Sequence, residues 1–201
     1  MRMSKKIIMV LITVVLVALI GFYAIVDKNH PIYDAKIDNS ELQSLELQEK
    51  DTVSQTFCVT EDLLDGVEMK MMVAGEPEEI VLKYELLDES GKQVLDGTCT
   101  MEDFKNGKFF EIRFDRVKGC KGKTYRFRMT VDACAKENTL SLYYADPQET
   151  GTSFVKPDGS VAGTMVLRTI THRFDIETFV VTACFAAYVV WFMRWLSKLF
   201  R

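Results

Sequence analysis

Four cysteines in the middle of the chain, Cys58, Cys99, Cys120 and Cys134, could form two disulfide bonds. An even number of cysteines suits an oxidising compartment, where disulfides persist. If the strands alternate in direction, Cys58 and Cys120 fall at one end of the fold, and Cys99 and Cys134 fall at the other. A disulfide cannot cross a strand length of about 20 Å, so we expect the pairs 58–120 and 99–134. The alternative is four reduced thiols.

An acidic loop follows the second predicted strand and carries Thr60, Glu61, Asp62 and Asp65. Oxygen ligands at this density could hold a structural calcium ion, for which Glu61, Asp62 and Asp65 are the candidate ligands. The alternative is a solvated acidic loop. No other cofactor is expected, and no cysteine spacing matches a zinc motif.

Catalytic chemistry has little support in the sequence. His30 and His172 are far apart, and no Ser-His-Asp pattern surrounds either of them. The many carboxylates do not single out a glycosidase pair. The segment 118–123 contains glycines but lacks the strand-then-helix setting of a phosphate-binding loop. We therefore expect a protein that is not an enzyme.

Tyrosines offer a different chemistry, because an exposed ring can stack on a sugar. Alternation places Tyr125 and Tyr144 in the core and leaves Tyr143 as the candidate for ligand stacking. The central region carries 19 basic and all 29 acidic residues, a net charge of about −10. Phosphate backbones need the opposite sign, which excludes nucleic acid as a partner.

Two apolar runs predict how the chain meets a membrane. Residues 7–26 form an uncharged stretch of about one bilayer thickness, preceded by basic residues. This length favours an uncleaved anchor over a cleaved signal peptide. The predicted segments are a cytoplasmic N-terminus (1–6), a first transmembrane helix (7–26), an extracytoplasmic β-sandwich domain (27–175), a second transmembrane helix (176–196) and a basic cytoplasmic tail (197–201). We thus expect a two-pass protein of the cell membrane with both termini cytoplasmic.

The second apolar run also carries features that suggest partners. Ala183 and Ala187 form a small-xxx-small pair, which permits close packing against another helix of this chain or of a membrane-protein partner. Arg194, Lys198 and Arg201 share one helical face, which suits either the anionic inner leaflet or an ordinary stop-transfer cluster. Cys184 lies inside this run as a small packing residue.

The alternation of apolar and polar residues in the central region predicts short β-strands. The clearest pattern is 109–131, two alternating runs joined by a glycine-containing turn, which predicts a β-hairpin. The other predicted strands are 42–48, 52–59, 67–73, 80–86, 93–100, 139–144 and 163–171. This spacing predicts an all-β extracytoplasmic jelly-roll β-sandwich flanked by two transmembrane α-helices.

Four short motifs of the central region resemble those of known proteins. They are Gln55-Thr56-Phe57, Asp65-Gly66-Val67-Glu68, Gly122-Lys123-Thr124-Tyr125-Arg126-Phe127 and Leu140-Ser141-Leu142-Tyr143-Tyr144. They resemble jelly-roll, carbohydrate-binding-module-like ectodomains of bacterial membrane proteins associated with surface-polysaccharide and glycosyltransferase systems. The resemblance covers about residues 41–171 and implies a sandwich fold and a glycan-related role.

Together these features predict a membrane-anchored, non-enzymatic accessory or binding protein of the bacterial cell envelope. Its domain would be presented to a glycan or to a membrane glycosyl-transfer partner. The alternative is a protein-docking subunit of an unrelated membrane complex, such as a transporter or sensor. The lipid bilayer, a membrane protein and a glycan are the expected partners.

Overall fold

The computed structural model describes residues 5–161 and 163–200. The chain divides into two units, one made of residues 1–28 and 172–201 and the other of residues 29–171. The helices are α1 (Lys5–Tyr23), α2 (Ile176–Leu199) and two 3₁₀ turns, η1 (Asn39–Glu41) and η2 (Pro77–Glu79). The strands are β1 (Ile25–Pro31), β2 (Gln43–Leu47), β3 (Thr52–Cys58), β4 (Leu63–Ala74), β5 (Val81–Asp88), β6 (Gln93–Thr100), β7 (Phe109–Lys118), β8 (Thr124–Ala133), β9 (Thr139–Ala145), β10 (Ser153–Val155), β11 (Thr164–Met165) and β12 (Leu167–Phe174).

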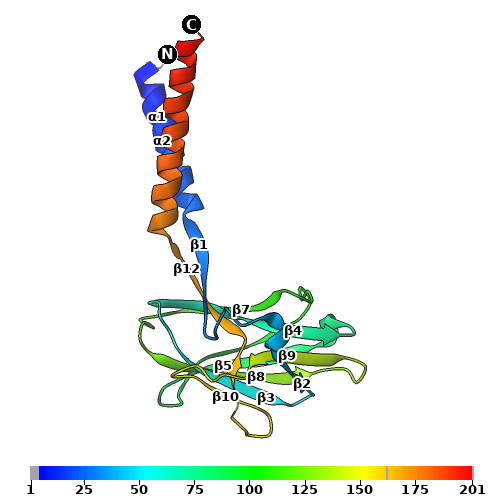
Figure 1. Cartoon of the computed structure of the whole chain (residues 1–201). Coiled ribbons are helices and arrows are strands. Elements are labelled where there is room, and N and C mark those ends of the chain that lie inside the picture. The colour runs from blue at the N-terminus through cyan, green and yellow to red at the C-terminus, as the bar shows by residue number, and fades with distance from the viewer. Residues whose placement is uncertain (1–4, 162, 201) are drawn as a thin grey trace. The chain divides into compact units, whose positions relative to one another are not determined.

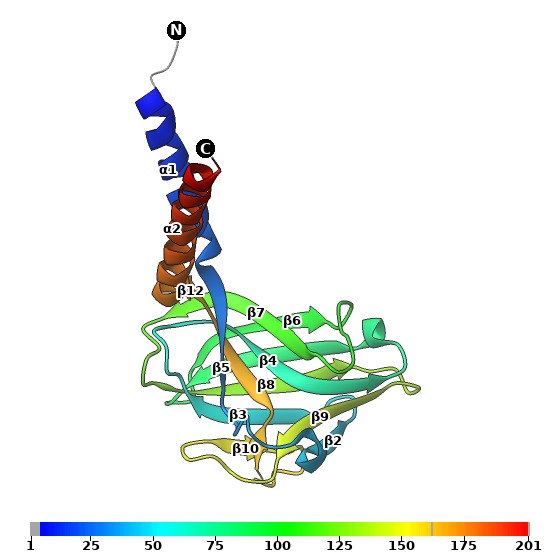
Figure 2. The ribbon, with the colours of Figure 1, turned by 45° about the horizontal axis from the view of Figure 1, so that its top comes forward.

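The strands of the second unit form two sheets that face each other as the layers of a sandwich (Figure 2). The larger sheet has the order β1-β12-β4-β9-β11, with β7 on the other side of β4 and β2 on the other side of β9. The smaller sheet has the order β10-β3-β8-β5-β6. The registers from β2 to β12 are antiparallel, which confirms the predicted β-sandwich.

The core lies between the two sheets and is built by the inward residue of each alternating pair. Phe57, Phe127 and Phe154 of the smaller sheet and Met69 and Ile112 of the larger sheet are fully buried. Alternation therefore predicted the faces of these strands correctly. It could not predict β10, because this short strand lies within a segment rich in turn residues.

The predicted hairpin over 109–131 is wrong, because its two strands belong to different sheets. β7 pairs with β4 in the larger sheet, whereas β8 pairs with β3 and β5 in the smaller one. The turn between them crosses from one layer to the other and is held by the backbone bond from Cys120 N to Asp62 O. Both strands still point their apolar residues into the same core, so the alternating sequence pattern is the same as that of a hairpin.

The first unit contains the two apolar helices, which lie side by side in both views (Figures 1 and 2). Only α2 is long and apolar enough to cross a membrane, among the residues that the structure describes. The predicted first span over 7–26 requires correction, because α1 ends at Tyr23 and Ile25 already belongs to β1. Among the residues whose side chains the structure describes, the apolar part of α1 is Leu11–Tyr23, which is shorter than α2.

Helix α2 starts at Ile176 as predicted, and Asp175 caps it. The Asp175 carboxylate accepts hydrogen bonds from the backbone N–H of Thr178 at 3.1 Å and from its hydroxyl. Lys28 lies 3.3 Å from the same carboxylate, and Asp27 lies 2.7 Å from His172. These contacts tie the chain after α1 to the chain before α2 within the first unit.

Candidate binding surface

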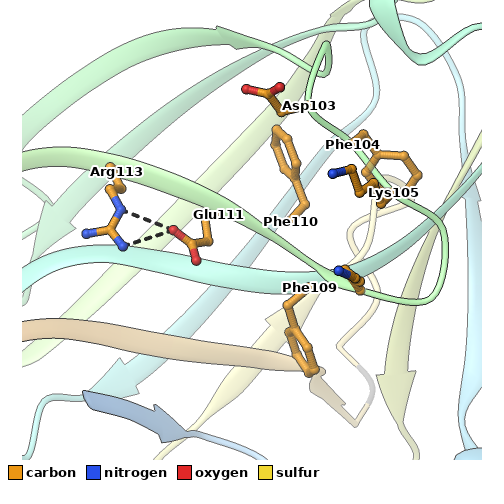
Figure 3. A pocket seen from close by; sticks show the side chains of 8 residues that line it. Asp103, Phe104, Lys105, Phe109, Phe110, Glu111 and Arg113 are labelled. Carbon is orange, nitrogen blue, oxygen red and sulfur yellow. Dashed lines mark hydrogen bonds and ion pairs between the residues drawn. The ribbon is translucent and has the colours of Figure 1, made fainter. Parts of the chain in front are cut away.

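A depression of about 440 Å³ lies beside β7 and the loop that precedes it (Figure 3). Its lining is Asp103, Phe104, Lys105, Lys108, Phe109, Phe110, Glu111 and Arg113. Phe109 and Phe110 point to opposite sides of β7, as successive residues of a strand must. The Phe110 ring packs against the Phe104 ring at 6.0 Å, so the apolar part of the lining is continuous with the core.

The loop before β7 is fastened to the neighbouring strand by one side chain. The Asn106 carbonyl accepts a hydrogen bond from Val73 N at 3.0 Å, and the Asn106 amide donates to Val73 O at 2.8 Å. Asn106 thus pairs with β4 in the way a further strand would. These two hydrogen bonds fix the backbone of the tight turn in which Lys105 and Lys108 lie on either side of Asn106.

On the outer face of the larger sheet, β4, β7 and β12 bring together an ion pair and an aromatic ring. The Arg168 guanidinium lies 3.1 Å from the Glu68 carboxylate and 3.7 Å from the centre of the Phe109 ring. It also donates to the Tyr33 hydroxyl at 3.4 Å. Burial alone would lower the pKa of Arg168, but its hydrogen bonds to Tyr33 and Glu68 raise it, so the cation is firmly retained.

Glu68 is the most buried charged group of this face, with 4% of its surface exposed. Asn29 donates a second hydrogen bond to its carboxylate at 3.0 Å. A carboxylate withdrawn from water this far requires such partners. The pair therefore holds the sheet together and fixes the orientation of Phe109, which borders the depression.

Tyr143, the predicted stacking residue, lies on the same outer face and is half-buried. Its hydroxyl donates to the Met72 sulfur at 3.6 Å, and the Lys70 ammonium lies 5.5 Å from the ring centre. Lys70 also donates to the Asn39 side chain at 2.7 Å. Sequence reasoning identified Tyr143 but missed Phe109. The alternation around Phe109 gives no indication that Arg168, 59 positions later, lies over its ring.

A second depression of about 390 Å³ follows β7 toward its far end. Its lining is Tyr84, Leu95, Asp96, Arg113, Phe114 and Asp115. Burial raises the pKa of the Tyr84 hydroxyl, which donates to Arg113 O at 3.4 Å. Arg113 therefore borders both depressions, so they form one surface along the free edge of β7.

No disulfide joins the cysteines in the structure, which differs from the predicted pairs 58–120 and 99–134. Cys58 is exposed, whereas Cys120 is fully buried, so the two side chains lie in different environments. Cys99 and Cys134 do share one end of the smaller sheet, but β5 lies between β6 and β8. The assumed alternation of strand direction predicted correctly which cysteines lie at the same end of the sandwich. It could not predict which side of a strand each cysteine faces, or which strands are neighbours.

The predicted calcium ligands do not converge, so this prediction also requires correction. Asp65 pairs with Arg116 at 2.6 Å, and Glu61 lies 3.3 Å from His30. Asp62 uses its backbone carbonyl to accept from Cys120 N. Over residues 5–161 and 163–200, no three His, Cys, Asp or Glu side chains are placed to hold a metal ion.

Helix α2 carries the remaining predicted residues. Ala183 lies on a half-buried stripe with Phe179, Thr182 and Ala186, whereas Ala187 is exposed. Ala183 and Ala186 therefore share this half-buried stripe, and the packing of Ala183 and Ala187 against another helix stays a prediction. Arg194 and Lys198 are exposed near the helix end, and Arg201 lies outside the described residues.

The two antiparallel sheets define the chain as a β-sandwich protein with a C-terminal apolar helix. No protein-family model matches the chain, and none of the curated proteins matches it. Among solved structures, it is similar to the cysteine protease and lectin-like domains of Cwp84, a surface layer associated protein of Clostridium difficile, with 11% identity and a TM-score of 0.42. That match covers 67% of this chain and 36% of the other.

A second similar structure is that of the infectious bursal disease virus Gx strain, with 10% identity and a TM-score of 0.31. It covers 72% of this chain and 38% of the other. The chain thus spans well under half the length of these proteins.

Proposed function

We propose that this chain is a membrane-anchored, non-enzymatic accessory or binding protein of a bacterial cell envelope. Its jelly-roll sandwich lies outside the cytoplasm and binds a glycan or a membrane glycosyl-transfer partner. Helix α2 crosses the bilayer, α1 accompanies it as a second membrane segment, and both termini are cytoplasmic.

The observation that carries the proposal is the exposure of α2. None of its 24 residues is buried, although the helix carries no charged residue between Glu177 and Arg194. Phe185, Val181 and Trp191 expose 66%, 68% and 62% of their surfaces. A helix that is apolar on every side needs an apolar solvent, and a bilayer supplies one.

The binding role is supported by the surface along β7. Half-exposed aromatic rings next to charged side chains on an open surface suit the binding of a chain-like ligand across that surface. Phe109 and Tyr143 supply rings on the outer face, and the depression beside Phe109 supplies charged groups.

Two experiments test the proposal on the full chain. A protease added to intact cells should remove the sandwich and spare tags on both termini; cleavage of either tag with a protected sandwich would overturn the topology. An array of envelope glycans probed with the detergent-solubilised protein should give binding. If no glycan on the array binds, and a transporter or sensor co-purifies with the protein in stoichiometric amount, the protein-docking alternative is favoured.

A further inference from the structure

The depression beside β7 carries two lysines with no acidic partner. Lys105 and Lys108 are exposed, and neither has an ion pair among residues 5–161 and 163–200. Arg113 and Glu111 on the same lining pair with each other at 3.0 Å, which leaves only Asp103 against the two ammonium groups. A local excess of positive charge is unusual on a region whose net charge is about −10.

The backbone that carries the two lysines is held in position before any ligand arrives. Both of the polar side-chain groups of Asn106 are bonded to the backbone of Val73, and Lys108 N donates to Lys105 O across the turn. Gly107 closes this turn with a φ of 82°, a conformation that glycine adopts without strain. Less conformational entropy is lost when a ligand binds to a turn already fixed in this way.

Aromatic rings border the same cations. Phe104 and Phe110 form the apolar part of the lining, and Phe109 is half-exposed with Arg168 over one of its faces. Phe104 and Phe110 are each only 9% exposed, so a sugar would contact their edges as an apolar patch, while the ammonium groups attract carboxylates or phosphates. This combination fits a sugar chain that carries negative charge.

The free edge of β7 is unsuited to a peptide strand. Leu64 pairs with Val117 and Gly66 with Arg113, so three residues of β7 lie opposite the single residue Asp65 of β4. Such a bulge bends the strand and increases its local twist. Strand addition needs a regular edge, so the bulge disfavours an extended peptide as the ligand.

We propose that the Lys105–Lys108 turn and the adjoining aromatic lining bind an anionic saccharide, charged through carboxylate or phosphate groups. This proposal rests on the proposed function, because it specifies the class of glycan. The charged groups are met by Lys105 and Lys108, and the sugar ring faces the Phe104 and Phe110 edge of the depression.

The test uses the full chain in detergent micelles, titrated with polygalacturonate, with a phosphomannan, and with fully methyl-esterified polygalacturonate as the neutral probe. We expect polygalacturonate or phosphomannan to bind at least about tenfold more tightly than the neutral chain, with affinity falling as salt rises. The comparison of the two anionic probes separates carboxylate from phosphate recognition.

The variant Lys105→Glu/Lys108→Glu should weaken anionic binding by at least about tenfold. The matched control is Lys118→Glu/Lys121→Glu, which reverses two exposed lysines at the same spacing outside the depression and should leave the affinity unchanged. Far-UV circular dichroism of both variants monitors the fold, and Lys105→Gln/Lys108→Gln repeats the test without added negative charge.

Three results would overturn the proposal in distinguishable ways. Equal binding of neutral and anionic chains would reject charge recognition but leave glycan binding standing. Equal losses in the two double variants would place the site elsewhere on the domain. Polyglutamate serves as a polyanion that is not a saccharide. Binding to polyglutamate, with none of the saccharides bound, would reject the glycan ligand and the glycan form of the proposed function together.

Discussion

The side-chain carbonyl of Gln55 accepts a hydrogen bond from the backbone N–H of Met165 at 2.8 Å, with both residues fully buried. Gln55 lies on β3 of the smaller sheet and Met165 on β11 of the larger one. This bond therefore joins the two layers through the core. The Gln55 amide donates to Thr56 O at 2.9 Å, so neither end of the side chain is left without a partner.

Gln55→Leu should destabilise the domain by about 2 kcal/mol, because it leaves the N–H of Met165 buried without an acceptor. Urea unfolding of the full chain in detergent, followed by circular dichroism, measures this. The control is Gln93→Leu at an exposed position of β6, which should change the free energy of unfolding by less than about 0.5 kcal/mol. Equal effects of the two substitutions would contradict the role of Gln55.

Arg168→Ala should lower the free energy of unfolding by about 2 kcal/mol, because the Glu68 carboxylate stays largely buried without its cation. The matched control is Arg128→Ala, which removes a similar 3.0 Å pair with Glu85 whose two side chains are 40% and 38% exposed. An exposed pair contributes less than about 1 kcal/mol. Adding Glu68→Gln to Arg168→Ala should recover part of the loss; no recovery would mean that Arg168 acts through packing alone.

The thiols should react with iodoacetamide at very different rates. Burial raises the pKa of the Cys99 thiol to about 11, from an ordinary value of 9.0, so its thiolate fraction at pH 8 falls about a hundredfold. In single-cysteine variants of the full chain, Cys58 should be alkylated first and Cys99 slowly, with a rate that rises up to about pH 11. Mass spectrometry follows the reaction. An intact mass lower by two hydrogens per bond, measured without reductant, would instead restore the predicted disulfides.

Asp175 should titrate below its ordinary pKa of 3.8, because its bonds from Thr178 and its contact with Lys28 favour the carboxylate. A lowered pKa means that this capping contribution is complete above pH 4 and is lost as the pH falls through the lower folded-state value. The amide chemical shift of Thr178 in micelles should report this titration. Asp175→Asn should keep the cap without the titration, and Asp175→Ala should lose both. A Thr178 shift that titrates at or above pH 4 would contradict the assignment.

Much of the fold was predictable because it depends on local patterns. Alternation of apolar and polar residues placed Phe57, Phe127 and Met69 on inward faces, and the uncharged run over 178–193 placed helix α2. Tyr143 was correctly assigned to an outer face by the same reasoning. These features follow from side-chain periodicity, which a strand or helix expresses wherever it packs.

Strand partners were not predictable, because pairing is a competition between distant segments. β7 and β8 have the local pattern of a hairpin, yet β7 pairs with β4 and β8 with β3 in separate sheets. For the same reason, Ile25 and Val26 belong to strand β1, although they are part of the apolar run over 7–26. Strand order also places β5 between the strand of Cys99 and the strand that precedes Cys134.

The sequence by itself determined which residues face the core, where the apolar C-terminal helix begins, and that the fold is a sandwich. Only the tertiary structure decided that Phe109 lies under Arg168 and that Asn106 holds Lys105 and Lys108 beside the depression. The physical reason is range: periodicity is set by neighbouring residues, whereas these contacts join segments that lie 33 or more residues apart.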